Sequence, residues 1–142
     1  MMRVLGVDVG ARRVGLAVSD PSRTLARPLA TLKVVSAADA VERVMNAITT
    51  LRAEDDGLDI VVVGMPARLD GSPTAETSRV VEFVEALRVR TPLVIMTEDE
   101  RLTSREAESR LAVGERDWRK RKEKLDAAAA AIILQDYLDI GG

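Results

Sequence analysis

The sequence predicts an α/β protein in which helices flank a mixed five-stranded sheet. Two extended apolar segments, 4–9 and 14–19, are joined by a connection too short for a helix, which predicts an antiparallel hairpin. Two later runs, 60–63 and 93–96, are continuously apolar, as expected of strands buried on both faces. Amphipathic segments stand between these runs, an alternation that is typical of crossovers between parallel strands.

The other elements follow from caps, turn residues and helical spacing. Residues 25–35 form a third extended segment, and Ser36 with Asp39 has the pattern of a capping box. Apolar residues at helical spacing then predict a helix after this cap. A second helix is predicted over 75–89, and it ends ahead of Pro92.

The last part of the chain is predicted to be helical. A second capping box at 103–106 opens a helix to about residue 113, and a basic segment precedes a final helix over about 124–138. The order is βββαβαβα, a three-stranded meander followed by crossovers, which is the topology of the ribonuclease H-like fold. A length of 142 residues is typical of one domain, so we assign residues 1–142 to a single domain of this fold.

Composition excludes several kinds of chemistry. The chain has no cysteine and no histidine, which excludes disulfides, zinc sites of the Cys/His kind and nucleophiles assisted by either residue. A metal must therefore be held by oxygen ligands, which favours Mg²⁺ or Mn²⁺. The absence of cysteine and of a long apolar run predicts a cytoplasmic protein without a membrane span.

Charge is unevenly distributed along the chain. The formal net charge of −2 argues against nonspecific binding of nucleic acid. Residues 116–124, however, hold six basic and two acidic residues, a local charge of +4 that leaves −6 for the rest. We expect this segment either to hold substrate phosphates and stack on a base or to be a solvated basic run. The expected substrate contacts are Trp118, Arg119, Lys120, Arg121 and Lys122.

Asp8 is the most informative residue of the first strand. A buried carboxylate inside an apolar strand is neutralised or given a partner. Alternation puts Leu5, Val7 and Val9 on one side of the strand and Asp8 with Gly6 on the other, where the small neighbour leaves room for a ligand. The alternative is that Asp8 only accepts hydrogen bonds from the backbone of the hairpin.

Two further acidic sites fall at the ends of elements. Glu98, Asp99 and Glu100 follow the strand at 93–96, where ligands of α/β sheets collect. Alternation sends Glu98 and Glu100 to one side and Asp99 to the other. Asp126 begins the final helix on its apolar stripe, which directs it toward the sheet. The alternative for the acids at 98–100 is a solvated turn between strand and helix. The alternative for Asp126 is an acid in the first turn of a helix, which the helix dipole favours.

These three acidic sites together predict a metal-dependent nuclease. Converging carboxylates repel one another without a cation between them, and they are the ligands that hard metals prefer. Two such metals about 4 Å apart activate a water and stabilise the leaving oxygen in phosphodiester hydrolysis. This chemistry needs neither histidine nor cysteine.

Four motifs, in order along nearly the whole chain, resemble the YqgF (RuvX-like) nuclease family. They comprise Gly6, Asp8, Gly10, Gly15, Ala17 and Asp20, then 63–66 with 70–72, then 99–103, then 125–138. Members of this family have the ribonuclease H-like fold. They are described as candidate nucleases of pre-16S ribosomal RNA, with Holliday-junction resolution as the older proposal.

The resemblance implies roles for individual residues. The catalytic and metal-binding acids that it implies are Asp8, Glu100 and Asp126. The supporting residues that it implies for substrate binding are Arg101 and Thr103. Glu98 departs from the motif by adding a carboxylate, so the choice of ligand among Glu98, Asp99 and Glu100 stays open.

Two functions of other classes compete with a nuclease. A sugar-kinase or actin-type nucleotide binder also has an Asp-x-Gly hairpin, but it needs two lobes, more than 142 residues supply. A catalytically inactive RNA-binding module would keep the fold without cleavage. For a nuclease, the implied substrate is structured precursor rRNA, at the 5′ end of pre-16S rRNA, or branched DNA. The sequence decides neither the substrate nor whether the protein is a homodimer.

Overall fold

The structure is a computed structural model that describes residues 1–66, 74–99 and 118–141, the last range as backbone only up to residue 125. Its elements are β1 (Arg3–Val9), β2 (Arg13–Ser19), β3 (Ala26–Lys33), α1 (Ala37–Ala53), β4 (Leu58–Met65), α2 (Ala75–Arg90), β5 (Val94–Asp99) and α4 (Trp118–Asp139). Within these ranges the order is the predicted βββαβαβα.

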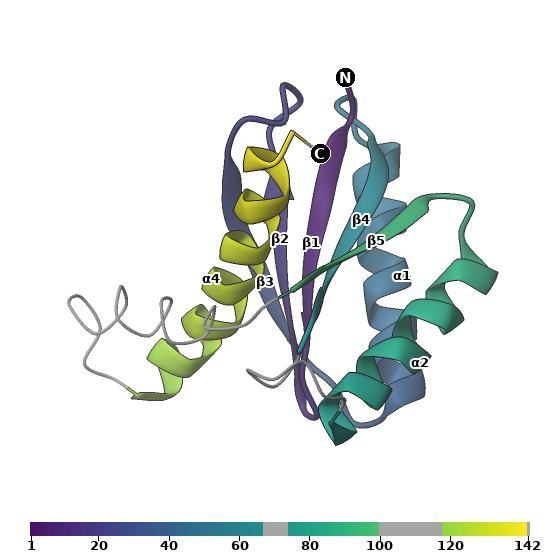
Figure 1. Ribbon diagram of the computed structural model, residues 1–142, viewed down its shortest axis with the longest axis vertical. Coiled ribbons are helices and arrows are strands. Elements are labelled where there is room, and N and C mark those ends of the chain that lie inside the picture. The colour runs from purple at the N-terminus through teal and green to yellow at the C-terminus, as the bar shows by residue number, and fades with distance from the viewer. Residues whose placement is uncertain (67–73, 100–117, 142) are drawn as a thin grey trace.

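The strands form one mixed sheet with β1 at its centre. The strand order is β3-β2-β1-β4-β5. β1 pairs antiparallel with β2 and β2 with β3, whereas β4 pairs parallel with both β1 and β5. Figure 1 shows α1 and α2 on one side of the sheet and α4 on the other. The predicted five-stranded sheet flanked by helices is therefore confirmed.

The two faces of β1 have different partners. Leu5, Val7 and Val9 belong to the larger apolar core, which includes the buried faces of α1 and α2. Val4 belongs to a second core, which α4 covers. Because side chains alternate along a strand, Asp8 shares the α4 face with Val4.

Side-chain caps fix where α1 and α2 begin. Ser36 Oγ accepts a hydrogen bond from the Asp39 backbone N–H (3.0 Å), while the Asp39 carboxylate accepts from the N–H of Val35 (2.9 Å). The predicted capping box is therefore present, but its second hydrogen bond comes from the N–H of Val35, the residue before the N-cap, and not from Ser36 itself. In α2, Thr74 and Thr77 form a reciprocal box that the sequence analysis missed, because threonine takes the place of the usual glutamate or glutamine.

The final helix begins at Trp118 rather than near residue 124, so the prediction of its start was wrong. Lysine, arginine, glutamate and leucine are good helix formers, and neither glycine nor proline interrupts this stretch. The predicted helix over 103–113 and residues 67–73 lie outside the described residues. No helix in the described ranges combines the length and apolar character needed to span a bilayer.

Candidate active site

Asp8 lies partly buried near the end of the central strand. In the antiparallel register of β1 and β2 it stands directly opposite Gly15. Paired residues in such a register point to the same face, about 5 Å apart. Whatever lies over Gly15 is therefore the immediate neighbour of the Asp8 carboxylate.

The backbone of Asp126 lies over Gly15. A Cβ atom added to Gly15 would stand 2.0 Å from the Asp126 carbonyl oxygen and 2.4 Å from its carbonyl carbon. Only a glycine permits this contact, because real Cβ atoms do not approach backbone so closely. The structure thus places the backbone of Asp126 beside the strand position that carries Asp8.

An arginine lies beside the Asp126 side chain. The Oδ2 atom of Asp126 is buried and lies 3.9 Å from Nη1 of Arg13, and the two side chains are only 27% and 28% exposed. This ion pair is too long for a direct hydrogen bond. Arg13 was not among the predicted site residues. The signal was available, because Arg13 precedes Gly15 by two positions and alternation puts both on the α4 face.

Gly6 has a different role from the one expected. The strand pattern predicts that it leaves room for a ligand beside Asp8. Instead, a Cβ atom added to Gly6 would lie 2.8 Å from Cβ of Leu134 and 2.9 Å from the carbonyl oxygen of Ala130. The space over Gly6 is filled by α4, so this glycine allows the helix to pack closely and does not provide a ligand cavity.

The end of β5 adds a further carboxylate to the same face. Glu98 pairs with Gly64 and Asp99 with Met65, and Met65 packs against the α1/α2 core. Glu98 and Asp99 therefore point to opposite faces, as predicted, with Glu98 on the side of Asp8. Burial, together with the charges of Asp136 and Asp99, raises the pKa of Glu98. The α4 face thus concentrates negative charge near the end of β5.

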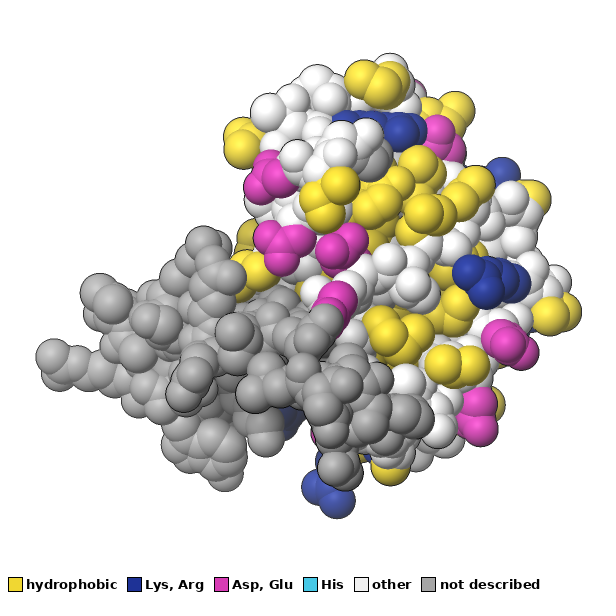
Figure 2. Space-filling model, viewed as in Figure 1, with side chains coloured by type: hydrophobic (Ala, Val, Ile, Leu, Met, Phe, Trp, Pro, Cys, Tyr) yellow, Lys and Arg dark blue, Asp and Glu magenta, His cyan; other side chains and the backbone are white. Residues whose placement is uncertain are grey.

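Part of this face stays open. α4 lies mainly over β1, β2 and β3. Val94 and Met96 of β5 pair with Ile60 and Val62 on the α4 side, yet they are 54% and 41% exposed. Figure 2 shows acidic side chains beside an apolar patch in this view. Among the described residues, the sheet beyond the edge of α4 is therefore accessible to solvent.

Several predicted site residues lie outside the described residues, namely Glu100, Arg101 and Thr103. Of Trp118, Arg119, Lys120, Arg121 and Lys122 the structure gives the backbone, in the first turns of α4. Within the described residues, no three His, Cys, Asp or Glu side chains are grouped closely enough to hold a metal. Asp8 and Asp126, which the Gly15 position brings to the same part of the sheet, offer the carboxylate oxygens that Mg²⁺ and Mn²⁺ prefer.

Comparison with known proteins gives a consistent result. A model of the family described as RuvX, Holliday junction resolvase, matches residues 2–140. A protein of Roseiflexus sp. (strain RS-1) is 38% identical over 137 residues, covering 96% of this chain and 94% of the relative. One from Caldanaerobacter subterraneus subsp. tengcongensis is 40% identical over 141 residues, covering 97% and 96%. Both are named as candidate pre-16S rRNA nucleases.

A solved structure shares the fold. T. thermophilus RuvC, in complex with a Holliday junction substrate, is similar with a TM-score of 0.62. The match covers 99% of this chain and 97% of that chain at 17% sequence identity. At this identity the similarity concerns the fold alone. It identifies the fold as ribonuclease H-like, as the order of elements predicts.

Proposed function

The chain belongs to the RuvX family, and we propose that it is a nuclease that hydrolyses phosphodiester bonds with Mg²⁺ or Mn²⁺. The observation that supports this most directly is the packing of Asp126 over Gly15, which makes it a neighbour of Asp8. Two carboxylates at one point of the α4 face, with no histidine or cysteine in the chain, suit a hard divalent cation. We propose Glu100 as the third acid of this site.

In this proposal Asp8, Asp126 and Glu100 hold the metal. A bound Mg²⁺ or Mn²⁺ supplies an activated water and stabilises the leaving oxygen. Asp8 sits on the central strand and Asp126 on a helix fixed by backbone contact, so both carboxylates are held before the substrate arrives. Arg13 offsets the charge of Asp126 and can donate hydrogen bonds to a phosphate oxygen at the same face.

The substrate contacts are proposed from charge and exposure. The first turns of α4 carry four consecutive basic residues and lead directly to Asp126. We assign phosphate binding to this run and base stacking to Trp118, with Arg101 and Thr103 as supporting residues. The partly open α4 face can accept a structured polymer.

We propose precursor rRNA as the substrate, at the 5′ end of pre-16S rRNA. This choice follows the names of relatives that match almost the whole chain. It places the protein in the cytoplasm. Branched DNA is the second candidate, because the description of the family and the fold of RuvC both favour it.

A cleavage panel tests this proposal. Precursor rRNA ends, four-way DNA junctions and single strands would be incubated with Mg²⁺ or Mn²⁺ and wild-type protein, Asp8→Asn or Asp55→Asn. Asp55 is an exposed acid in the turn after α1 and serves as the matched control. We expect wild type and Asp55→Asn to cleave the rRNA ends, and Asp8→Asn to be inactive.

The panel also separates the competing functions. Preference for junctions would identify a resolvase. Tight RNA binding without cleavage by any variant, at any metal concentration, would instead identify an inactive RNA-binding module and reject the nuclease.

A further inference from the structure

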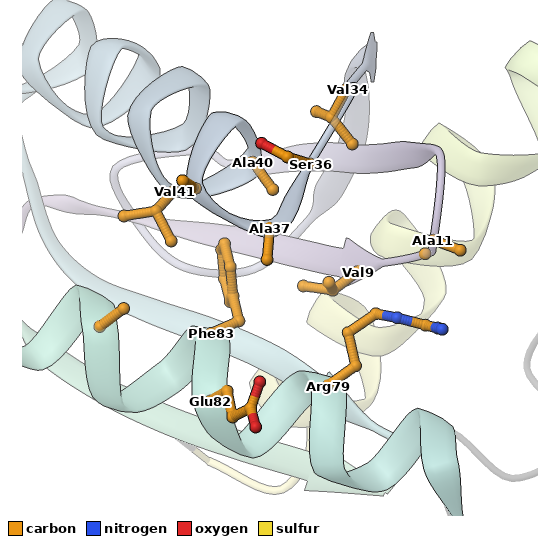
Figure 3. A pocket seen from close by; sticks show the side chains of 13 residues that line it. Val9, Ala11, Val34, Ser36, Ala37, Ala40, Val41, Arg79, Glu82 and Phe83 are labelled. Atoms are coloured by element: carbon orange, nitrogen blue, oxygen red, sulfur yellow. The ribbon is translucent and has the colours of Figure 1, made fainter.

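A cavity lies on the opposite face of the sheet from Asp8. Its volume is about 270 Å³, and it opens between α1, α2 and the end of β1. Its walls are largely apolar, and Figure 3 shows Val9, Ala37 and Phe83 around it. Sites for drug-sized ligands span about 300–1,000 Å³. This cavity lies just below that range, so it suits one flat ring system and not a larger ligand.

The cavity adjoins the proposed catalytic site through the backbone of β1. Val9, which lines it, directly follows Asp8, and alternation sends their side chains to opposite faces. Gly10 and Ala11 also line the cavity and begin the hairpin connection to β2. One turn of chain therefore separates a group bound in the cavity from a group bound at Asp8.

Three arginines lie near this turn, at positions that run from one face of the sheet to the other. Arg13 lies on the α4 face beside Asp126. Arg12 is exposed at the turn, and its carbonyl accepts a hydrogen bond (2.9 Å) from Val34, which lines the cavity. Arg79 lines the cavity itself, with its guanidinium extended toward the side of Ala11 (Figure 3). Within the described ranges, neither the Arg12 nor the Arg79 side chain takes part in a hydrogen bond or an ion pair.

We propose that this cavity receives one unpaired base of the nucleic-acid substrate, next to the phosphate that is cleaved. The strand would pass over the Gly10–Arg13 turn, with its phosphates on Arg12 and Arg79 and its base against Phe83. This inference rests on the proposed nuclease function. It adds that the substrate has an unpaired nucleotide beside the cut, as a single-stranded precursor end has.

The polar rim of the cavity adds a preference among bases. Among the described residues, Glu82 is the one acidic residue that lines it. A carboxylate accepts hydrogen bonds and cannot donate them, so it favours the exocyclic amino group of cytosine over the N3–H of uracil, which two carbonyl oxygens flank. Cytosine and uracil have nearly the same size, and we expect cytosine to bind more tightly at this position.

An abasic scan with a cavity-filling variant tests the proposal. Single-stranded RNA that spans the cleavage site would carry one abasic nucleotide at successive positions, with binding measured in Ca²⁺ to suppress cleavage. Ala37→Leu fills the cavity from an exposed position at the start of α1, and Ala53→Leu, exposed at the other end of α1, is the control. In wild type and in Ala53→Leu, one abasic position beside the cut should weaken binding about 10- to 100-fold.

In Ala37→Leu, intact RNA should bind as weakly as the abasic RNA binds wild type, and the abasic position should have no further effect. Arg79→Gln should lower the log–log salt slope of binding by about 0.7, the value of one phosphate contact on a single strand. A flat abasic scan, or an undiminished abasic effect in Ala37→Leu, would overturn the inference. Because cleavage of unmodified RNA is measured separately, a flat scan with intact cleavage rejects only the base pocket. A flat scan together with no cleavage of unmodified RNA rejects the nuclease as well.

Discussion

The two faces of the sheet hold their helices in opposite ways. On the α1/α2 face, contact is made through large side chains such as Val44, Ile48 and Phe83, and a cavity of about 270 Å³ remains beside them. On the α4 face, the helix backbone approaches the strand backbone at Gly6 and Gly15, where even a Cβ atom does not fit. One interface leaves a cavity beside the large side chains, whereas the other brings helix and strand backbones into contact at two glycines.

This difference is suited to the chemistry proposed for each face. Long side chains change rotamer, so a carboxylate carried by a loosely packed helix would vary in position. A helix held by backbone contact has less of this freedom, and the backbone of Asp126 lies at the contact itself. Ala130 and Ala127 keep this side of α4 small, and Ile133 and Leu134 fill the remaining core. We infer that close packing positions the acids, while the looser face leaves space for a ligand.

The first prediction breaks the close interface. Gly15→Ala places a methyl group 2.0 Å from the Asp126 carbonyl oxygen, so α4 or β2 must move. Overpacking usually costs about 1–3 kcal/mol, and a clash with backbone belongs at or above the upper end of that range. We expect the free energy of unfolding to fall by about 3 kcal/mol, measured by denaturant titration, and cleavage to be lost because Asp126 moves away from Asp8.

The matched control adds volume to the loose face. Ala86→Leu introduces a larger side chain on α2 beside the cavity, where space exists. Its unfolding free energy should stay within about 1 kcal/mol of wild type. Equal losses in the two variants would show that the interfaces do not differ in tightness.

The sequence alone predicted the features that depend on local patterns. Alternation in β1 placed Asp8 on the face opposite Val7 and Val9, and the apolar stripe of the last helix turned Asp126 toward the sheet. The start of α4 was misplaced because a run of basic residues is compatible with both a loop and a helix. Sequence periodicity does not show where a helix begins when its first turns carry no apolar stripe.

The features that the sequence did not predict depend on contacts between distant segments. The packing of Asp126 on Gly15 joins residues more than a hundred positions apart, and only the assembled sheet shows it. The space over Gly6 was predicted to hold a ligand, because the sequence does not show that Leu134 fills it. The cavity likewise combines residues from β1, α1 and α2, and no single stretch of sequence predicts a gap.

The second prediction uses the metal to sharpen the assignment of the α4 face. A cation that binds only the folded protein stabilises it, by about 2.7 kcal/mol at a concentration 100 times its Kd. Millimolar Mg²⁺ or Mn²⁺ should therefore raise the melting temperature of wild type and of Asp55→Asn, but not of Asp8→Asn. A scanning-calorimetry experiment in which Asp8→Asn shifts as much as wild type would place the metal elsewhere.

The third prediction compares basic residues of α4 with basic residues of α1, on the opposite side of the sheet. Replacing Arg119, Lys120, Arg121 and Lys122 with glutamine should flatten the salt dependence of duplex binding by about two to four units, at about 0.9 per lost phosphate contact. The control replaces the exposed Arg43 and Arg52 of α1, which should leave the slope unchanged. Melting temperatures should barely change in either protein. An unchanged slope in the glutamine variant would mean that this part of α4 is a solvated basic run and does not bind phosphates.

The smallest expected effect measures the repulsion between the paired acids. In EDTA at low ionic strength, Asp8→Asn should raise the free energy of unfolding by up to about 1 kcal/mol, because one of two neighbouring negative charges is removed. Asp126→Asn should gain less, since it also removes the partner of Arg13, 3.9 Å away, and so loses some attraction along with the repulsion. Denaturant titrations of the two variants beside wild type give both values. Destabilisation by more than about 1 kcal/mol in both variants would mean that the two carboxylates support the fold. The close approach of α4 would then serve stability rather than a metal site.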